Sequence, residues 1–148
     1  MKPKNMIRKV TLFLLLIIPS WLVSMEPGDK VENFRLLDQK GGSHELFYYN
    51  DQKALIFLVQ GNGCPIVRHA AARFQELKDI YKDQEVEFFM INSNLQDDRI
   101  TITEEAKEYN YDLRILVDDS QIIGESLELS RTGEVFVINP KKWSVAYI

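Results

Sequence analysis

The stretch that decides the fold is Ala54-Leu-Ile-Phe-Leu-Val-Gln-Gly-Asn-Gly-Cys-Pro-Ile-Val-Arg68. Residues 54–59 are an uninterrupted apolar run, which is typical of a strand buried on both faces of a sheet. The two glycines of the following loop allow a tight backbone path. Pro65 suits the first position of a helix, because the N–H that proline lacks would be unpaired there. The stretch therefore predicts strand, loop and helix, with Cys64 as the helix N-cap.

Helical periodicity continues over residues 65–81 and separates an apolar face from a charged one. The apolar positions are Ile66, Val67, Ala70, Phe74, Leu77 and Tyr81, and most of the charges (Arg68, Arg73, Glu76, Asp79) lie elsewhere. We expect the apolar face to pack against the sheet that contains the strand at 54–59.

Further strands and helices are predicted on both sides of this unit. The predicted strands are residues 33–38, 86–91, 115–117, 134–139 and 143–148, with turns at 39–42 and 140–142. A capping box formed by Thr101 and Glu104 predicts a helix through Tyr109. Residues 118–120 can cap another helix, which runs to about Leu129.

The order of these elements predicts the fold class. From residue 54 onward, strands and helices alternate and end in a β-hairpin, so we expect an α/β protein with a mixed central sheet flanked by helices. The sequence stops at its last predicted strand, with no carboxy-terminal helix after it. Two interpretations are open: the sequence is a fragment, or one face of the sheet is less covered.

The amino terminus has the layout of a secretory signal. Residues 1–9 are basic, residues 10–18 are apolar, and a short segment of small and apolar residues ends at Ser24. The apolar run is shorter than the ~20 residues of a membrane-spanning helix. We therefore expect a signal peptide over 1–24, with an uncleaved anchor as the alternative, and one domain over 25–148 that is exported to the periplasm or the extracellular space.

Charge and cysteine content exclude several functions. Residues 1–24 hold four of the 18 basic residues and none of the 22 acidic ones, so the remaining chain has a net charge of -8. Such an acidic domain argues against nucleic-acid binding. Cys64 is the only cysteine, which excludes an internal disulfide and argues against a copper site with two cysteine ligands. No phosphate-binding glycine loop or Ser/His/Asp set is evident, and no metal or cofactor is expected.

The thiol of Cys64 is the one group that indicates chemistry. Unpaired N–H groups and the helix dipole favour a thiolate at a helix N-terminus. Arg68, one turn further along, adds positive charge, so we predict a lowered thiol pKa. The alternative is an inert thiol that packs as a small apolar side chain.

Residues 27–148 resemble the redoxins of the thioredoxin-like superfamily, in particular the peroxiredoxins of the alkyl-hydroperoxide-reductase/thiol-specific-antioxidant (AhpC/TSA) type. Four segments in matching order are similar to that family: Pro27-Gly-Asp-Lys-Val-Glu-Asn-Phe34, Gly63-Cys64-Pro65, Phe88-Phe-Met-Ile-Asn-Ser93 and Ser130-Arg-Thr-Gly-Glu-Val-Phe-Val-Ile-Asn-Pro140. The resemblance implies a thioredoxin-like fold and a redox activity.

The resemblance also implies the site. Cys64 would be the nucleophilic thiolate, and Arg131 lies where family members often have an arginine near the thiol. The active-site loops would comprise Gly61, Asn62, Gly63, Pro65, Thr132 and Gly133. The substrate would be a peroxide or a disulfide, and the reductant an external thiol, either a thioredoxin-like protein or a small molecule.

Several positions depart from the family pattern. Gly61 occupies the first cysteine position of Cys-x-x-Cys, and Phe57 and Gly61 stand at the Pro and Thr of the peroxiredoxin motif. Gly133 falls at the family's cis-proline, and no resolving cysteine is present. Two functions therefore stay open: a single-cysteine oxidoreductase that forms a sulfenic acid or a mixed disulfide, and a non-catalytic binding or accessory domain.

Overall fold

A seven-stranded sheet forms the centre of the protein in the structure, a computed structural model that describes residues 25–148. The predicted signal segment, residues 1–24, lies outside the described residues. The strands are β1 (Arg35–Asp38), β2 (Ser43–Glu45), β3 (Ala54–Val59), β4 (Val86–Asn92), β5 (Arg114–Val117), β6 (Val135–Asn139) and β7 (Ser144–Tyr147). Their spatial order is β2-β1-β5-β4-β3-β6-β7.

The sheet is mixed, as the sequence predicts. The central strands β3, β4 and β5 run parallel to one another, whereas β1 and β6 flank them in antiparallel orientation. The β6–β7 hairpin closes one edge of the sheet. The opposite edge is the hairpin of β1 with β2, a three-residue strand that the sequence analysis missed, as it missed the 3-10 helix η1 (Leu46–Tyr49) after it.

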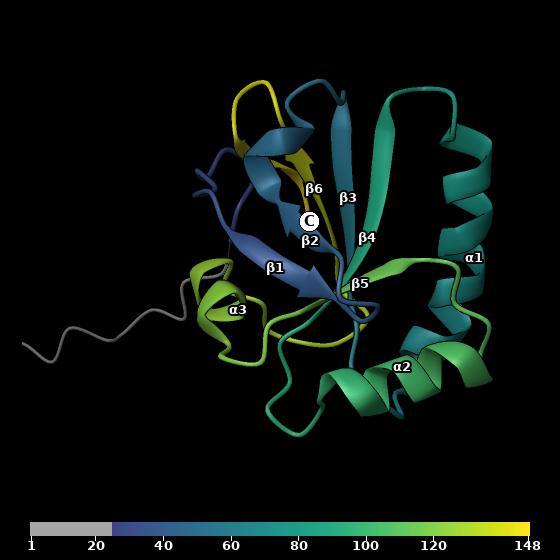
Figure 1. The fold of residues 1–148 in the computed structure, drawn as a ribbon. Coiled ribbons are helices and arrows are strands. Elements are labelled where there is room, and N and C mark those ends of the chain that lie inside the picture. The colour runs from purple at the N-terminus through teal and green to yellow at the C-terminus, as the bar shows by residue number, and fades with distance from the viewer. Residues whose placement is uncertain (1–24) are drawn as a thin grey trace, which may run out of the picture.

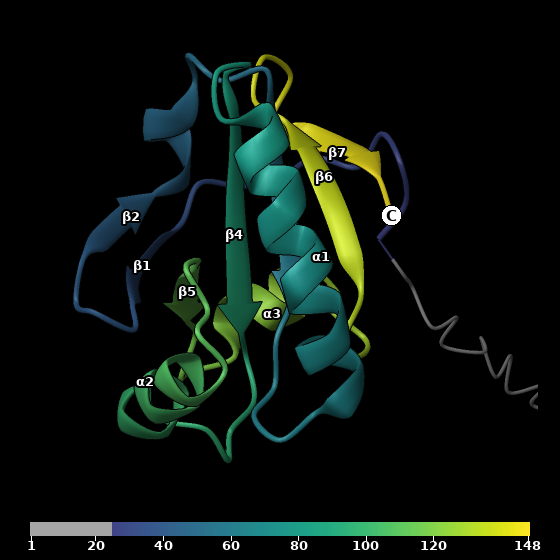
Figure 2. The same ribbon diagram turned by 90° about the vertical axis from the view of Figure 1, so that its right-hand side faces the viewer.

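Helices cover both faces of the sheet. Helix α1 (Pro65–Tyr81) lies in front of β4 and β6 in Figure 2, while α3 (Ile122–Ser126) lies behind the strands. Helix α2 (Arg99–Glu108) crosses the lower end of the molecule in Figure 1 and packs with α1 on one apolar cluster. The other cluster lies between the sheet, η1 and the end of α3.

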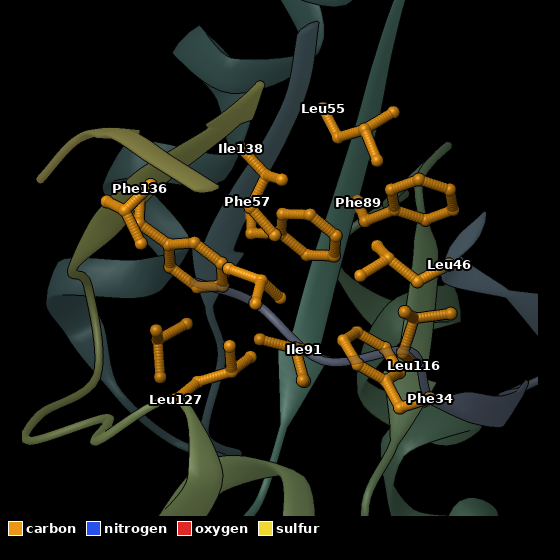
Figure 3. Close-up of a cluster of buried hydrophobic side chains, with 13 residues drawn as sticks. Phe34, Leu46, Leu55, Phe57, Phe89, Ile91, Leu116, Leu127, Phe136 and Ile138 are labelled. Carbon is orange, nitrogen blue, oxygen red and sulfur yellow. The ribbon is translucent and has the colours of Figure 1, made fainter. Parts of the chain in front are cut away.

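The apolar run of β3 supplies side chains to both clusters. Leu55, Phe57 and Val59 belong to the cluster under η1 and α3, and Leu58 belongs to the cluster under α1. This alternation follows from the two-residue period of a strand. Figure 3 shows Phe57 in the middle of its cluster. The centroid of its ring lies 5.3 Å from that of Phe89 on β4 and 4.8 Å from that of Phe136 on β6.

Three local predictions were wrong. Helix α2 begins at Arg99 and not at Thr101, because Asp98 is the N-cap and forms the capping box with Thr101. Helix α3 ends at Ser126, well before Leu129, and its N-cap is Gln121, which has no side-chain cap bond. Ile66 is not on the buried face of α1: 65% of it is exposed.

No helix within residues 25–148 has the length and hydropathy needed to cross a membrane.

Candidate active site

Cys64 lies where β3 passes into α1, at the carboxyl end of the parallel strands. It is the N-cap of α1, with extended backbone angles, and Pro65 follows as the first helical residue. The thiol is half-buried, so a small molecule can reach it. The position predicted for Cys64 is thus the position found.

A hydroxyl from a distant loop meets the sulfur. Thr132 Oγ1 donates a hydrogen bond to Cys64 Sγ over 3.3 Å, across 68 positions of sequence. This bond is the largest influence that holds the pKa of the Cys64 thiol below its ordinary value, followed by the backbone N–H of Val67. Burial and the negative charge of Glu105 act in the opposite direction. The geometry therefore favours the thiolate, the form of cysteine that acts as a nucleophile.

Gly61 makes room for Thr132. A Cβ atom at position 61 would stand 2.7 Å from Thr132 Cγ2, closer than carbon atoms approach. The family motif has a threonine at position 61, and its hydroxyl is missing here. In this chain a hydroxyl reaches the sulfur from the loop before β6 instead, and the absence of a side chain at position 61 permits it.

A buried carboxylate from α2 holds the loop before the thiol. Glu105 is only 8% exposed and accepts a hydrogen bond from the backbone N–H of Gly63 at 2.7 Å. It also forms an ion pair with Arg68, whose Nε lies 3.3 Å from its other oxygen. The Arg68 guanidinium packs over the ring of Tyr109 at 4.2 Å. The charge that Arg68 was predicted to lend the thiol is therefore paired with Glu105.

A carboxylate and three side-chain amides fix the rest of the loop. Asp97 accepts hydrogen bonds from the backbone N–H of Asn62 and from the side chain of Asn92, both at 2.9 Å. Gln60 links the same Asn92 to the side chain of Asn62. These contacts tie the loop to the end of β4 and leave it little freedom to move away from Cys64.

One buried hydroxyl below this site has no partner. Tyr111 packs in the same apolar cluster as Cys64, and within the described residues its Oη is the one buried side-chain polar atom without a hydrogen bond. Burial, followed by the charge of Glu105, raises the pKa of Tyr111 to about 12. The phenol therefore stays protonated at neutral pH.

The loop at Gly133 differs from a cis-proline loop. Residues 25–148 contain no cis peptide bond, and Gly133 has φ +84°, a conformation that favours glycine. Its N–H donates to the carbonyl of Val59 at 2.8 Å, a bond that a proline would lack. A Cβ at position 133 would stand 2.9 Å from Ile66 Cγ2, so this exposed isoleucine covers the loop from the side of α1.

The remaining predicted positions are separated from the sulfur. Arg131 is exposed and makes no hydrogen bond or ion pair within the described residues, and so none with Cys64. It lines a cleft beyond Thr132. Phe57 lies in the core under η1 and α3 and is fully buried, so it is no part of the site.

The sequence analysis missed Glu105 and Asp97. Both belong to runs of acidic residues that look like a solvated surface in the sequence, and only the packing of α2 and the preceding loop brings them to Gly63 and Asn62. Within residues 25–148, no three His, Cys, Asp or Glu side chains group closely enough to hold a metal ion.

Fold and site together define a redoxin-type member of the thioredoxin-like class, with one thiol at the start of α1. The family model for the AhpC/TSA family matches residues 27–146. The chain therefore belongs to the AhpC/TSA family.

Solved structures agree with this assignment. A hypothetical protein from Sinorhizobium meliloti 1021 is 25% identical, with a TM-score of 0.70 over 83% of this chain and 69% of that one. Peroxidoxin BcpB from Mycobacterium tuberculosis is 19% identical, with a TM-score of 0.68 over 82% of each chain. A putative thiol:disulfide interchange protein DsbE from Chlorobium tepidum is 15% identical, with a TM-score of 0.70 over 83% of this chain and 84% of that one. At these identities, the peroxidoxin and the interchange protein show only that their fold is the fold of this chain. No curated protein matches the sequence.

Proposed function

We propose that this protein is a thiol oxidoreductase in which the Cys64 thiolate reduces a peroxide or a disulfide. The observation that supports the proposal best is the hydrogen bond from Thr132 to Cys64 Sγ at the start of α1. Together with the Val67 N–H it favours the ionised sulfur. A depressed thiol pKa in a partly exposed setting is the usual mark of a reactive cysteine.

With a peroxide, the thiolate sulfur attacks the nearer oxygen and the O–O bond breaks. The sulfur is oxidised to a sulfenic acid, and the leaving oxygen takes up a proton as water or an alcohol. With a disulfide substrate, the thiolate forms a mixed disulfide and releases a thiolate. An external thiol must complete either cycle, because the chain has no second cysteine.

The alternative is a binding or accessory domain without turnover. It is favoured by the altered loop, where a trans Gly133 covered by Ile66 stands in place of the family's cis-proline. In that case the Cys64 thiol would have no catalytic role, and its pKa would be that of a free cysteine.

One experiment separates the two functions. The rate of Cys64 alkylation is measured between pH 5 and 10, and the rate of its oxidation by hydrogen peroxide at pH 7, with Cys64→Ser as the blank. We expect a midpoint well below the free-thiol value of about 8.5 and oxidation faster than that of free cysteine. A midpoint near 8.5 with oxidation no faster than a simple thiol would establish the accessory function.

We further propose that the protein works outside the cytoplasm. The proposal rests on the basic, then apolar, layout of residues 1–24. Expression of the full chain in a Gram-negative host, followed by fractionation and mass measurement, tests it. A periplasmic product that lacks about 24 residues is expected, a full-length membrane-bound product would establish the anchor, and a cytosolic product would refute export.

A further inference from the structure

A polar cleft opens directly beyond Thr132, on the carboxyl ends of β3 and β4. It is lined by residues that follow these strands and by the loop before β6: Val59, Gln60, Ser93, Asn94, Gln121, Leu129, Ser130, Arg131 and Thr132. Thr132 thus belongs both to the cleft and to the immediate surroundings of the Cys64 sulfur. In open α/β sheets, ligands bind in the crevice outside the carboxyl ends of the parallel strands.

One end of the cleft offers a free cation. Arg131 is exposed, and within residues 25–148 its guanidinium has neither a carboxylate partner nor a hydrogen bond. A guanidinium presents five N–H donors in a fixed fork, which matches a carboxylate in two-point contact. Arg68, the other arginine near the site, is already paired with Glu105. A ligand carboxylate in this cleft would therefore find its partner in Arg131.

The neighbouring hollow is acidic. A second hollow shares Ser93, Gln121, Leu129 and Ser130 with the first and adds two glutamates, Glu125 and Glu128. Neither glutamate forms an ion pair with a described residue. The two hollows thus present a positive group beside Thr132 and negative groups in the part that Thr132 does not line, which suits a ligand with both a carboxylate and an ammonium group.

A protein with a single thiol needs an external thiol as its reductant. On the proposed function, Cys64 becomes a sulfenic acid that only an outside thiol can reduce. The first thiol attacks the sulfur of Cys–S–OH, forms Cys–S–S–R and releases water; a second thiol attacks the mixed disulfide, restores the Cys64 thiol and leaves as the disulfide R–S–S–R. Two thiols supply the two electrons that the peroxide has taken.

We propose that this cleft binds a small zwitterionic thiol, an amino acid or short peptide of the cysteine type, as the reductant of Cys64. Arg131 would hold the carboxylate, and Glu125 and Glu128 would attract the ammonium group. This inference rests on the proposed function, because only an oxidised Cys64 needs a reductant. It assigns Arg131 to the second half of the cycle and not to the attack on peroxide.

The test compares thiols that differ by one charged group. Cys64 is first oxidised with hydrogen peroxide, and the loss of its sulfenic acid is then timed with cysteine, N-acetylcysteine, cysteine methyl ester and 2-mercaptoethanol. Rates are compared at equal thiolate concentration and relative to the rate of each thiol with a small reference disulfide, because the thiolate is the attacking species and its nucleophilicity falls with its pKa. We expect cysteine to react about tenfold faster than 2-mercaptoethanol, which corresponds to roughly 1.4 kcal/mol of binding, with the two singly charged analogues in between.

Charge variants assign this preference to the cleft. Arg131→Gln should lower the cysteine rate to that of cysteine methyl ester, and Glu125→Gln with Glu128→Gln should lower it to that of N-acetylcysteine. Lys82→Gln is the matched control, since this exposed cation lies at the far end of α1. Equal rates for all four thiols, or a cysteine preference that survives Arg131→Gln, would overturn the inference. The inference would also be overturned if a protein dithiol reduced the sulfenic acid of Cys64 faster than every small thiol, and at the same rate in Arg131→Gln.

A binding measurement keeps the inference separate from the proposed function. S-methylcysteine cannot react, so its binding to Cys64→Ser is followed by NMR titration. Shifts at Gln121 and Ser130 that vanish in Arg131→Gln are expected, and their absence in Cys64→Ser would refute the cleft. If Cys64 resists oxidation by peroxide, the peroxide reaction of the proposed function fails before any reductant is added, and the titration still decides whether the cleft binds.

Discussion

The side chain that decides the reactivity of Cys64 is a threonine on another loop. Thr132→Val keeps the shape of the side chain and removes the hydroxyl that donates to the sulfur. We expect the pKa of Cys64 to rise and its alkylation at pH 7 to slow by about tenfold, the factor for loss of roughly 1.4 kcal/mol in a bond to a charged acceptor. Thr132→Ser, which retains the hydroxyl, is the control. An unchanged pH profile in the valine variant would show that the bond has no influence on the thiol.

The negative charge of Glu105 should make the Cys64 thiol less acidic. Glu105→Gln removes a negative charge that raises the pKa of Cys64, while the amide oxygen can still accept from the Gly63 N–H. The pH midpoint of alkylation should therefore fall, with a rise of roughly threefold in rate at pH 6, as expected for a screened charge interaction below 1 kcal/mol. Glu104→Gln, exposed on the same helix, should leave the midpoint where it is. A midpoint that rises in Glu105→Gln would contradict the electrostatic role.

The sequence placed Cys64 at the start of the helix, and the family resemblance put Thr132 in an active-site loop, but neither predicted the bond from Thr132 to the sulfur or the role of Glu105. Cys64 could be placed because its setting is local: a buried strand, a glycine loop and a proline at the helix start lie within a dozen residues. Thr132 and Glu105 reach the site through tertiary packing, across 68 positions in the case of Thr132. No periodicity or spacing in one sequence indicates such a contact.

Among the elements, the β1–β2 hairpin depends on one carboxylate. Asp38, at the end of β1, accepts hydrogen bonds at 2.8 Å from His44 and from the backbone N–H groups of Lys40 and Gly42. Burial opposes its ionisation, but these bonds outweigh burial and hold the pKa of Asp38 below its usual value. The ionised carboxylate of Asp38 thus holds the hairpin together through three hydrogen bonds.

The lowered pKa of Asp38 gives stability a defined pH dependence. The stabilisation is fully present above the unfolded pKa of about 4 and is lost as the pH falls through the lower folded value. Asp38→Asn should therefore reduce the free energy of unfolding by on the order of 2 kcal/mol at pH 7, and the difference from the unsubstituted protein should shrink below pH 4. Urea unfolding at pH 7, 5 and 3 measures it, with the exposed Asp83→Asn as control. A pH-independent difference would exclude the charge as its source.

Elements with strong patterns were predicted to within a residue or two. The helix at 65–81 agrees with α1, because Pro65 marks its start and the apolar period continues to its end. The helix at 99–108 begins earlier than predicted, because Asp98 and Thr101 compete for the same cap and only the backbone decides between them. The strand at 43–45 was missed because three polar residues show no alternation, and pairing with β1 alone makes it a strand.

In the whole molecule, three stacked phenylalanines join the central strands. Phe57 lies between Phe89 and Phe136, on neighbouring strands at either side, and all three are essentially buried. Phe57→Ala should lower the free energy of unfolding by about 3–5 kcal/mol, the usual cost of removing a buried aromatic ring. That is a large share of the 5–15 kcal/mol that holds a typical domain together. Urea denaturation measures the loss.

The matched control for this prediction is Tyr48→Ala. Tyr48 is aromatic but 74% exposed, so its removal should change the free energy of unfolding by less than about 0.5 kcal/mol. Comparable losses in both variants would show that the stack contributes nothing beyond ordinary surface contacts.

The close approach of Thr132 to Gly61 has a consequence for how such chains evolve. Since a Cβ at position 61 would stand 2.7 Å from Thr132 Cγ2, a larger residue at 61 requires the threonine side chain to turn or to be replaced, so substitutions at the two sites should be coupled. In a related chain that has threonine at 61, we expect a smaller residue at 132, so that the hydroxyl passes from one loop to the other while the sulfur keeps its donor. Correlated substitution at these two sites, in a collection of related sequences, would be the historical record of that exchange.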